Sequence, residues 1–263
     1  MGINVMLIGE TKTGKTAALE TLPRGVVDFS FDIGGWHSLG RRGKKVKVVR
    51  RLGEWLDSGE RLEESEILVV DYTVADPVAE AQYTAFSTEL IGMFIKDFNL
   101  LWKRQQECIE KGVCHIAIDS LTSFQRPILE YIIAINARVL ATQQDWGQAI
   151  NKVDEIVQSA VALPFDFIMT SHIQAEKDEI TGKVRELPLI YGKQLPNMIL
   201  AKFDDIFLTI KERTPTGIVY RWGTAPEGLL QCIGTRNFDN LPLRIEPNFT
   251  KLYGDRLFNG GER

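Results

Sequence analysis

A phosphate-binding loop near the start of the chain constrains its fold more than any other feature. The loop matches G-x-x-x-x-G-K-[ST] at every position and comprises Gly9, Glu10, Thr11, Lys12, Thr13, Gly14, Lys15 and Thr16. An apolar run at residues 3–8 predicts a buried strand before it, and residues 17–22 begin a predicted helix after it. Strand, loop and helix in this order are the context in which the motif binds nucleotides. We expect the nucleotide to contact the whole loop and Ala17 after it.

The residue types in the loop explain how it would hold a triphosphate. Gly9 and Gly14 allow the backbone to curl, so that successive N–H groups point at phosphate oxygens. Lys15 reaches the β- and γ-phosphates, and the Thr16 hydroxyl is a ligand for Mg²⁺. Lys12 has two interpretations, a contact to the γ-phosphate or a solvated loop lysine. The expected cofactors are therefore ATP and Mg²⁺.

Strand-like and helix-like segments alternate along the chain, which predicts an α/β fold with a mostly parallel central sheet and helices on both faces. Predicted strands lie at residues 26–31, 45–49, 67–70, 113–118, 165–170, 206–211 and 218–222, the last two forming a late antiparallel hairpin. Predicted helices run from Pro77, after a turn at Asp76, to about residue 111 with a break near Gly92, and over residues 127–142, 145–162 and 192–202. A further hairpin is predicted at 174–188, with Thr181 and Gly182 at its tip.

The composition of the chain limits the classes of protein to which it can belong. The 263 residues are 44% hydrophobic and 25% charged, as in soluble globular proteins, and no apolar run is long enough to span a membrane. The first strand begins too early to leave room for a signal peptide, and the three cysteines have no metal or disulfide spacing. We therefore expect a cytoplasmic protein, with an ATPase core over 1–235 and an irregular C-terminal extension over 236–263, packed on the core or trailing from it.

One short segment is strongly basic although the chain carries a net charge of −4. Seven of the eleven residues in 41–51 are lysine or arginine. Two interpretations are equally supported. The segment contacts a phosphate backbone or an acidic neighbouring subunit, or it is a charged edge strand that prevents aggregation.

A second part of the nucleotide site is predicted at residue 119. Apolar residues of the predicted strand 113–118 lead directly into Asp119, and the carboxyl end of a parallel strand lines the ligand crevice. A carboxylate there would hold the Mg²⁺ shell, although a strand-terminal aspartate also commonly caps the next helix. His115, in the same strand, is expected to pack against its neighbours.

Polar residues at three other strand ends are candidate catalytic groups. Asp32 and Asp71 each follow a strand and are candidates for orienting the attacking water, although Asp71 can equally open the turn that follows it. His172 and Gln174 follow the strand at 165–170 and are candidates for sensing the γ-phosphate, with ordinary strand-end polarity as the alternative.

Five segments together resemble the RecA-like ATPases of bacteriophages, some of which act as recombinases on single-stranded DNA. The segments read GETKTGKT, FSFDIGG, HIAIDSLTSF, DWGQAINKVDEIVQ and FIMTSHIQ. The resemblance covers about residues 3–235. It implies a RecA-like P-loop core, ATP hydrolysis, and a homo-oligomer with the nucleotide at or near the subunit interface.

The resemblance also implies functions for particular residues, and the sequence departs from the family in places. The DNA-contacting segment would be residues 175–187, yet its net charge is negative, which opposes contact with a phosphate backbone. The glutamate that orients water would fall near Gly34, so either Asp32 substitutes for it or ATP hydrolysis is slow. A basic residue that reaches the neighbouring subunit's nucleotide would be Arg236, with Arg213 as second choice.

Three functions follow from these features. The first is an ATPase of phage DNA recombination, repair or replication that binds single-stranded DNA. The second is a nucleotide-dependent assembly protein that recruits protein partners, such as other phage recombination or replication proteins, and not DNA. The third is a small-molecule phosphotransferase, which is disfavoured because no arginine-rich lid is evident.

Overall fold

A ten-stranded mixed sheet forms the centre of the molecule. The structure is a computed structural model and describes residues 2–73, 83–177, 182, 184–192, 194–258 and 260. The parallel strands of the sheet are β1 (Asn4–Ile8), β2 (Gly25–Ser30), β3 (Lys45–Val49), β4 (Glu66–Asp71), β5 (Val113–Asp119), β6 (Asp166–Ser171) and β9 (Asp205–Thr214). Its antiparallel strands are β10 (Gly217–Gly223), β11 (Gly234–Thr235) and β12 (Arg244–Ile245). The order is β12-β10-β9-β1-β6-β5-β2-β4-β3, with β11 paired to β9. The predicted parallel sheet and late antiparallel hairpin are confirmed.

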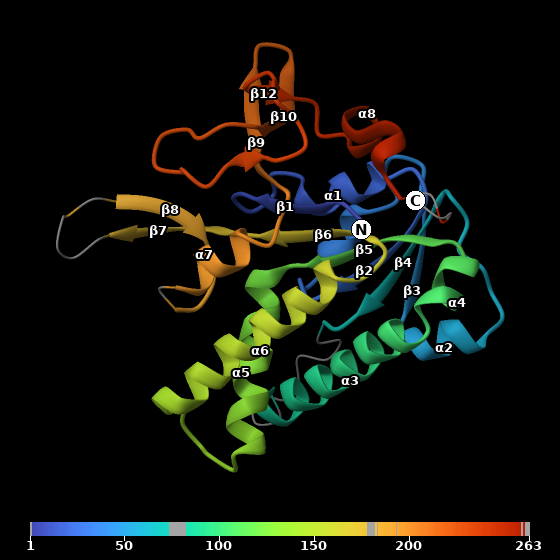
Figure 1. Cartoon of the computed structure of the whole chain (residues 1–263), viewed down its shortest axis with the longest axis vertical. Helices are drawn as coiled ribbons and strands as arrows, with labels where there is room; N and C mark the ends of the chain where they lie inside the picture. The colour runs from blue at the N-terminus through green and yellow to red at the C-terminus, as the bar shows by residue number, and fades with distance from the viewer. Residues whose placement is uncertain are drawn as a thin grey trace.

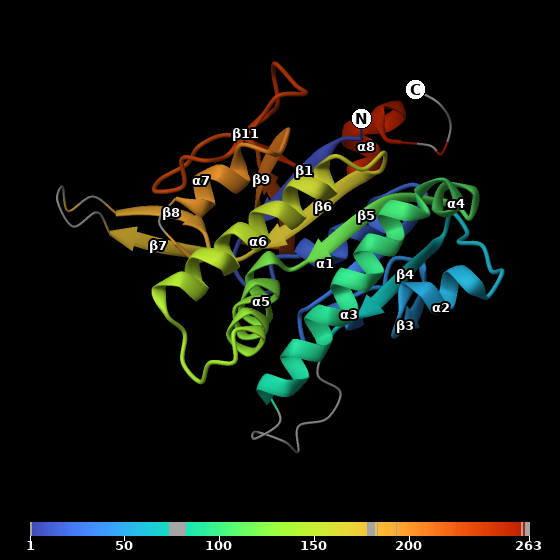
Figure 2. The same cartoon turned by 60° about the horizontal axis from the view of Figure 1, so that its bottom comes forward.

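Helices cover both faces of this sheet (Figures 1 and 2). They are α1 (Lys15–Ala18), α2 (Leu52–Asp57), α3 (Tyr83–Lys103), α4 (Gln105–Glu110), α5 (Leu121–Ile135), α6 (Gln143–Val161), α7 (Leu195–Leu200) and α8 (Phe249–Tyr253). The α3, α5 and α6 helices pack on one face, and α1 and α8 pack on the other. Among the described helices, none combines the length and the apolar sequence needed to span a bilayer.

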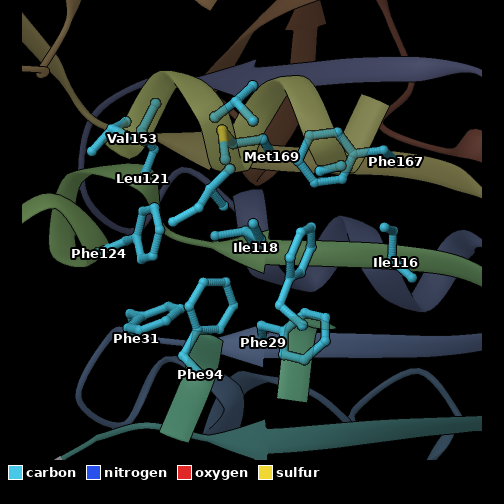
Figure 3. Close-up of a cluster of buried hydrophobic side chains, with 14 of the residues drawn as sticks. Phe29, Phe31, Phe94, Ile116, Ile118, Leu121, Phe124, Val153, Phe167 and Met169 are labelled. Carbon is cyan, nitrogen blue, oxygen red and sulfur yellow. The ribbon is translucent and has the colours of Figure 1, made fainter. Parts of the chain in front are cut away.

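A cluster of aromatic rings fixes the face that carries α3 and α5 (Figure 3). Phe31, just after β2, lies 5.2 Å from Phe94 of α3 and 5.0 Å from Phe124 of α5 between ring centroids. Phe94 and Phe124 are themselves 5.1 Å apart, and all three rings are buried. Such pairs contribute about 0.5–1.5 kcal/mol each beyond area burial. The cluster therefore fixes the end of β2, where Asp32 follows, against the start of α5.

The helix after the phosphate loop is much shorter than residues 17–22 suggested. One α-helical turn, α1, passes into a 3₁₀ turn at Leu19–Thr21, and Leu22 is extended with φ −71° and ψ 138°. Pro23 explains the end, because the residue before a proline is disfavoured in the helical region.

The predicted helix break near Gly92 is wrong. The α3 helix continues through Gly92, where a glycine costs about 1 kcal/mol relative to alanine. The buried neighbours Ile91 and Phe94 outweigh that cost, because burying such a side chain contributes about 1.5–3 kcal/mol. The chain leaves the helical region instead at Arg104, with φ −113° and ψ 29°.

Other predicted helix boundaries are also corrected. The α5 helix starts at Leu121 and not at residue 127, because the Ser120 hydroxyl caps it by accepting the backbone N–H of Ser123 at 3.3 Å. Pro127 lies inside this helix. The α7 helix is shorter than residues 192–202. The predicted turn at Asp76, helix start at Pro77 and hairpin-tip residue Thr181 lie outside the described residues.

A separate two-stranded sheet projects from the core beside α7 (Figure 1). It consists of β7 (Ile173–Lys177) and β8 (Val184–Pro188), which pair antiparallel and confirm the predicted hairpin.

The C-terminal residues pack against the sheet. Phe249 of α8 packs against Trp222, and the Phe258 N–H donates to Asp166 at 2.6 Å. Residues beyond 235 thus contribute to the core, and the domain boundary at 235 stays a prediction.

Candidate nucleotide-binding site

The phosphate loop leaves the carboxyl end of β1 in a conformation that requires its two motif glycines. Gly14 has φ 91°, in the left-handed region that favours glycine. At Gly9, an added Cβ would lie 2.3 Å from Thr209 Oγ1 and 2.7 Å from the Thr209 carbonyl oxygen, so no larger residue fits. Both motif glycines are therefore required by the conformation of the loop.

Lys15 lies folded over the loop that precedes it. Its Nζ donates to the carbonyls of Gly9 at 2.9 Å and Glu10 at 2.7 Å, and lies 3.3 Å from His172 Nδ1. Burial lowers the pKa of Lys15 to about 8, against the opposing effect of nearby carboxylates. Burial and the Lys15 charge also lower the pKa of His172, so this ring is neutral at neutral pH. A buried cation of this kind is suited to binding phosphate.

Thr16 and Asp119 meet across the base of the loop, as the sequence predicts for a Mg²⁺ site. Thr16 Oγ1 donates to Asp119 Oδ2 at 2.5 Å, and Thr170 Oγ1 donates to the other carboxylate oxygen. Burial, followed by the charge of Asp32, raises the pKa of Asp119 to about 6.

The donor set at Thr16 and Asp119 fits Mg²⁺ bound together with a nucleotide. Mg²⁺ prefers oxygen ligands and is usually held by one or two protein groups plus substrate phosphates and water. Within the described part of the chain, no group of three or more His, Cys, Asp or Glu residues forms an all-protein metal site. The two oxygen donors therefore suit an ion that arrives with the triphosphate.

Asp32 is held beside Asp119 by two serines from the start of α5. The hydroxyls of Ser120, at 2.8 Å, and Ser123 both donate to Asp32 Oδ1. Among the hydrogen bonds of the residues that the structure describes, none involves Asp32 Oδ2. Asp32 and His172 line the same cavity. The second carboxylate oxygen of Asp32 is thus available to a water molecule.

A cavity of about 1120 Å³ lies beside the loop, and most of the predicted site residues line it. Those that line it are Thr11, Lys12, Gly14, Lys15, Thr16, Ala17, Asp32 and His172. Six basic residues line it, namely Lys12, Lys15, Arg41, Arg42, Arg126 and Lys211, against the acidic Glu20 and Asp32. This excess of positive charge, on a chain of net charge −4, favours an anionic ligand.

Several predicted residues lie elsewhere. Gln174 does not line the cavity, and its Nε2 donates to the Ile190 carbonyl at 3.5 Å. Asp71 accepts hydrogen bonds from Trp36 Nε1 at 3.3 Å and from Thr73, which fits the turn-opening alternative.

The two arginines considered for contact with a neighbouring subunit differ in position. Arg236 donates to the Ala201 carbonyl at 3.1 Å, beside the start of β9 and at the opposite end of that strand from the loop. Arg213 lies near the far end of β9, beyond the loop. His115 is fully buried and its Nδ1 lies 3.1 Å from Asp166 Oδ2, as expected for a packed strand residue.

The basic segment at 41–51 does not form one patch. Its strand, β3, is the sheet edge, as one of the two interpretations requires. Lys47 pairs with Glu60 and Glu66, and Arg51 pairs with Asp97. Arg41 and Arg42 instead face the nucleotide cavity.

Sequence reasoning missed two residues that line the cavity, Lys211 of β9 and Tyr220 of β10. The two lie directly opposite each other in the β9–β10 register. Both strands were predicted as a hairpin, but the sequence carries no signal that β9 lies beside β1 and its loop.

Comparisons with known proteins show the family to which the chain is similar. A family model described as "AAA domain" matches residues 1–229, which include the loop, Asp119 and Tyr220. Among curated proteins, no sequence matches the chain. Similar solved structures include the KaiC-like protein PH0186 from Pyrococcus horikoshii OT3, with 13% identity, a TM-score of 0.40, and coverage of 94% of this chain and 88% of that one. The flagellar accessory protein FlaH from Methanocaldococcus jannaschii has 12% identity, a TM-score of 0.40, and coverage of 92% and 83%.

Proposed function

The chain belongs to the AAA domain family of nucleotide-binding ATPases, and on this premise we propose that it binds ATP with Mg²⁺ and hydrolyses it. The observation that carries the proposal is the joint placement of Lys15, Thr16 and Asp119. A buried cation, a hydroxyl and a carboxylate meet at the base of a phosphate loop, within a positively charged cavity. These are the groups that a P-loop ATPase uses on a triphosphate.

Each side chain has a distinct part in the proposed reaction. Lys15 binds the β- and γ-phosphate oxygens in place of the two loop carbonyls that it contacts here. Thr16 and Asp119 hold Mg²⁺, which when bound neutralises charge on the β- and γ-phosphates. Asp32, fixed through Oδ1 by Ser120 and Ser123, orients a water with Oδ2.

Replacing Asp32 tests its proposed contact with water. Asp32→Asn keeps the side-chain shape but weakens the acceptor, so we expect the Kd for ATP to change less than threefold and kcat to fall about 10²–10⁴-fold. Phosphate release at saturating ATP measures the effect. Asp71→Asn is the matched control, because Asp71 ends the neighbouring strand and does not line the cavity. An unchanged kcat in Asp32→Asn would make Asp32 a structural residue.

We further propose that the protein assembles into a homo-oligomer with the nucleotide near the subunit interface. Ile33 supports this, because it lies directly after Asp32 at the cavity and is 81% exposed. A neighbouring chain seated over the cavity would remove this apolar side chain from water. Arg236, beside the start of β9, and Arg213, near the outer end of the β9–β10 hairpin, remain the two residues proposed to reach a neighbour's nucleotide.

We propose that the ATPase acts on single-stranded DNA in phage recombination, repair or replication. The resemblance of the five sequence segments to phage RecA-like ATPases supports this function. Ion pairs limit the positive charge that is available to contact DNA. Lys47 and Arg51 are in ion pairs, and Arg185 of β8 pairs with Glu176 of β7 at 2.9 Å. Lys183 in the same hairpin lies outside the described residues.

A DNA function predicts that single-stranded DNA raises the rate of ATP hydrolysis. We expect stimulation of at least about tenfold at low salt, declining as salt rises, because phosphate contacts release counterions. Phosphate release with and without a poly-dT oligonucleotide, at two salt concentrations, measures this. Unchanged rates together with no salt-sensitive binding would contradict the DNA function and leave the ATPase itself standing.

A protein-recruiting ATPase is the alternative, and one surface feature favours it. The loop between α5 and α6 exposes Val139 by 95% and Leu140 by 80%. The loop is held in shape by Asp145, which accepts hydrogen bonds from Arg138 at 2.5 Å and Asn136 at 2.7 Å. Two fixed, exposed aliphatic side chains suit a protein contact. Light scattering that shows nucleotide-dependent assembly, without DNA stimulation, would support this function.

A further inference from the structure

The β9–β10 hairpin is joined to the phosphate loop at the loop's own base. Thr209 Oγ1 of β9 lies 2.6 Å from Thr13 Oγ1 and also donates to the Ile8 carbonyl at 3.2 Å. Two residues further along β9, on the same face of the strand, is Lys211. Tyr220 of β10 lies opposite Lys211 in the register, so the two side chains emerge from the same face.

Tyr220 lies against the loop and lines the nucleotide cavity. A Cβ added at Gly14 would be 3.3 Å from Tyr220 Cδ1, which places the ring beside the loop backbone. The ring is half-buried and also lines the cavity. Lys211 is exposed in the same cavity and forms no ion pair among the residues that the structure describes. An aromatic ring and a lysine ammonium thus line the cavity side by side.

The sheet order shows which end of a nucleotide these two residues would meet. Asp32 follows β2, Asp119 ends β5 and His172 follows β6. These three strands all lie on one side of β1. These residues surround Lys15 and mark the γ-phosphate and Mg²⁺ end. The β9–β10 hairpin lies on the other side of β1. A nucleotide with its γ-phosphate at Lys15 therefore extends across the loop toward the hairpin with its base.

We propose that the β9–β10 hairpin binds the base end of the nucleotide within the same chain, with Tyr220 stacking on the base and Lys211 contacting the phosphates outside the loop. The inference rests on the proposed ATP binding and assigns the contact with the base to Tyr220 and a further phosphate contact to Lys211. Aromatic rings stack on bases through their faces, which every base offers. A lysine ammonium is a point charge that contacts phosphate oxygens without selecting a base.

Binding of ATP and of inorganic tripolyphosphate separates the two functions, because tripolyphosphate has no base. In Tyr220→Leu, which keeps an apolar side chain against Gly14, we expect the Kd for ATP to rise about 10–100-fold and the Kd for tripolyphosphate to stay within about twofold. Tyr220→Phe should bind ATP like the unaltered protein. Lys211→Ala should weaken both ligands by about tenfold. Titration calorimetry of the full chain measures each of these Kd values.

Arg221→Ala is the matched control, since Arg221 is the next residue along β10 and points to the opposite face. It should change neither Kd. Equal weakening of both ligands by Tyr220→Leu would mean that the ring only supports the loop, and no weakening of either would place the base elsewhere. Both results overturn the inference while ATP binding by the unaltered protein stands. Absence of ATP binding by the unaltered protein overturns the proposed function as well.

Discussion

Lys15→Ala is expected to abolish tight ATP binding. The ammonium would form two charge-assisted hydrogen bonds with phosphate oxygens, and each contributes about 1.5–3 kcal/mol. Losing both raises the Kd by about 10²–10⁴-fold. Calorimetric titration of ATP in the presence of Mg²⁺ measures the change, and thermal melting without nucleotide shows whether the variant is folded. A folded Lys15→Ala protein with an unchanged Kd would contradict the assigned function of this residue.

Lys12→Ala is the comparison within the same loop. Lys12 is exposed at the cavity, with φ 64°, and its two interpretations predict different results. A solvated lysine predicts a change in Kd below about threefold. A γ-phosphate contact predicts a loss closer to that of Lys15→Ala, and would show that two lysines of the loop share the terminal phosphate.

Asp119→Asn is expected to separate nucleotide binding from hydrolysis. The amide weakens the contact to Mg²⁺, which supplies several kcal/mol of charge stabilisation in the reaction, so kcat should fall at least about 10³-fold. Without Mg²⁺, ATP affinity should be retained or improved, because a negative charge beside the phosphates is removed. Phosphate release and ATP titration with and without Mg²⁺ measure both quantities.

The result that would contradict this function of Asp119 is full Mg²⁺-dependent activity in the variant. The control is to show that the Asp119→Asn variant is folded, because Asp119 is fully buried and accepts hydrogen bonds from Thr16 and Thr170. Thr170→Val removes one of these bonds without altering the carboxylate. It should therefore melt at a lower temperature with much less effect on kcat.

The sequence predicts the centre of this site because the signals there are local. The loop motif is contiguous, and Asp119 and Asp32 directly follow apolar strands. Parallel strands end at one edge of the sheet, so the residues that follow them are brought together whatever the strand order. This accounts for the convergence of Asp32, Asp119 and His172 on Lys15.

Features that depend on distant pairing could not be predicted in the same way. Tyr220 and Lys211 reach the loop only because β9 pairs with β1, about 200 residues earlier in the chain, and no local pattern encodes that neighbour. Gln174 illustrates the converse case. Its strand leaves the main sheet and pairs with β8, so closeness to His172 in sequence does not place the side chain in the cavity.

The most direct measurement is calorimetric titration of the folded, unaltered chain with ATP in the presence of Mg²⁺. If Lys15, Thr16 and Asp119 bind a magnesium triphosphate, the titration gives a saturable heat of binding with one nucleotide per chain. Binding is weaker when Mg²⁺ is withheld. The absence of any heat with ATP and with a non-hydrolysable analogue, in well-folded protein, would contradict nucleotide binding at this loop.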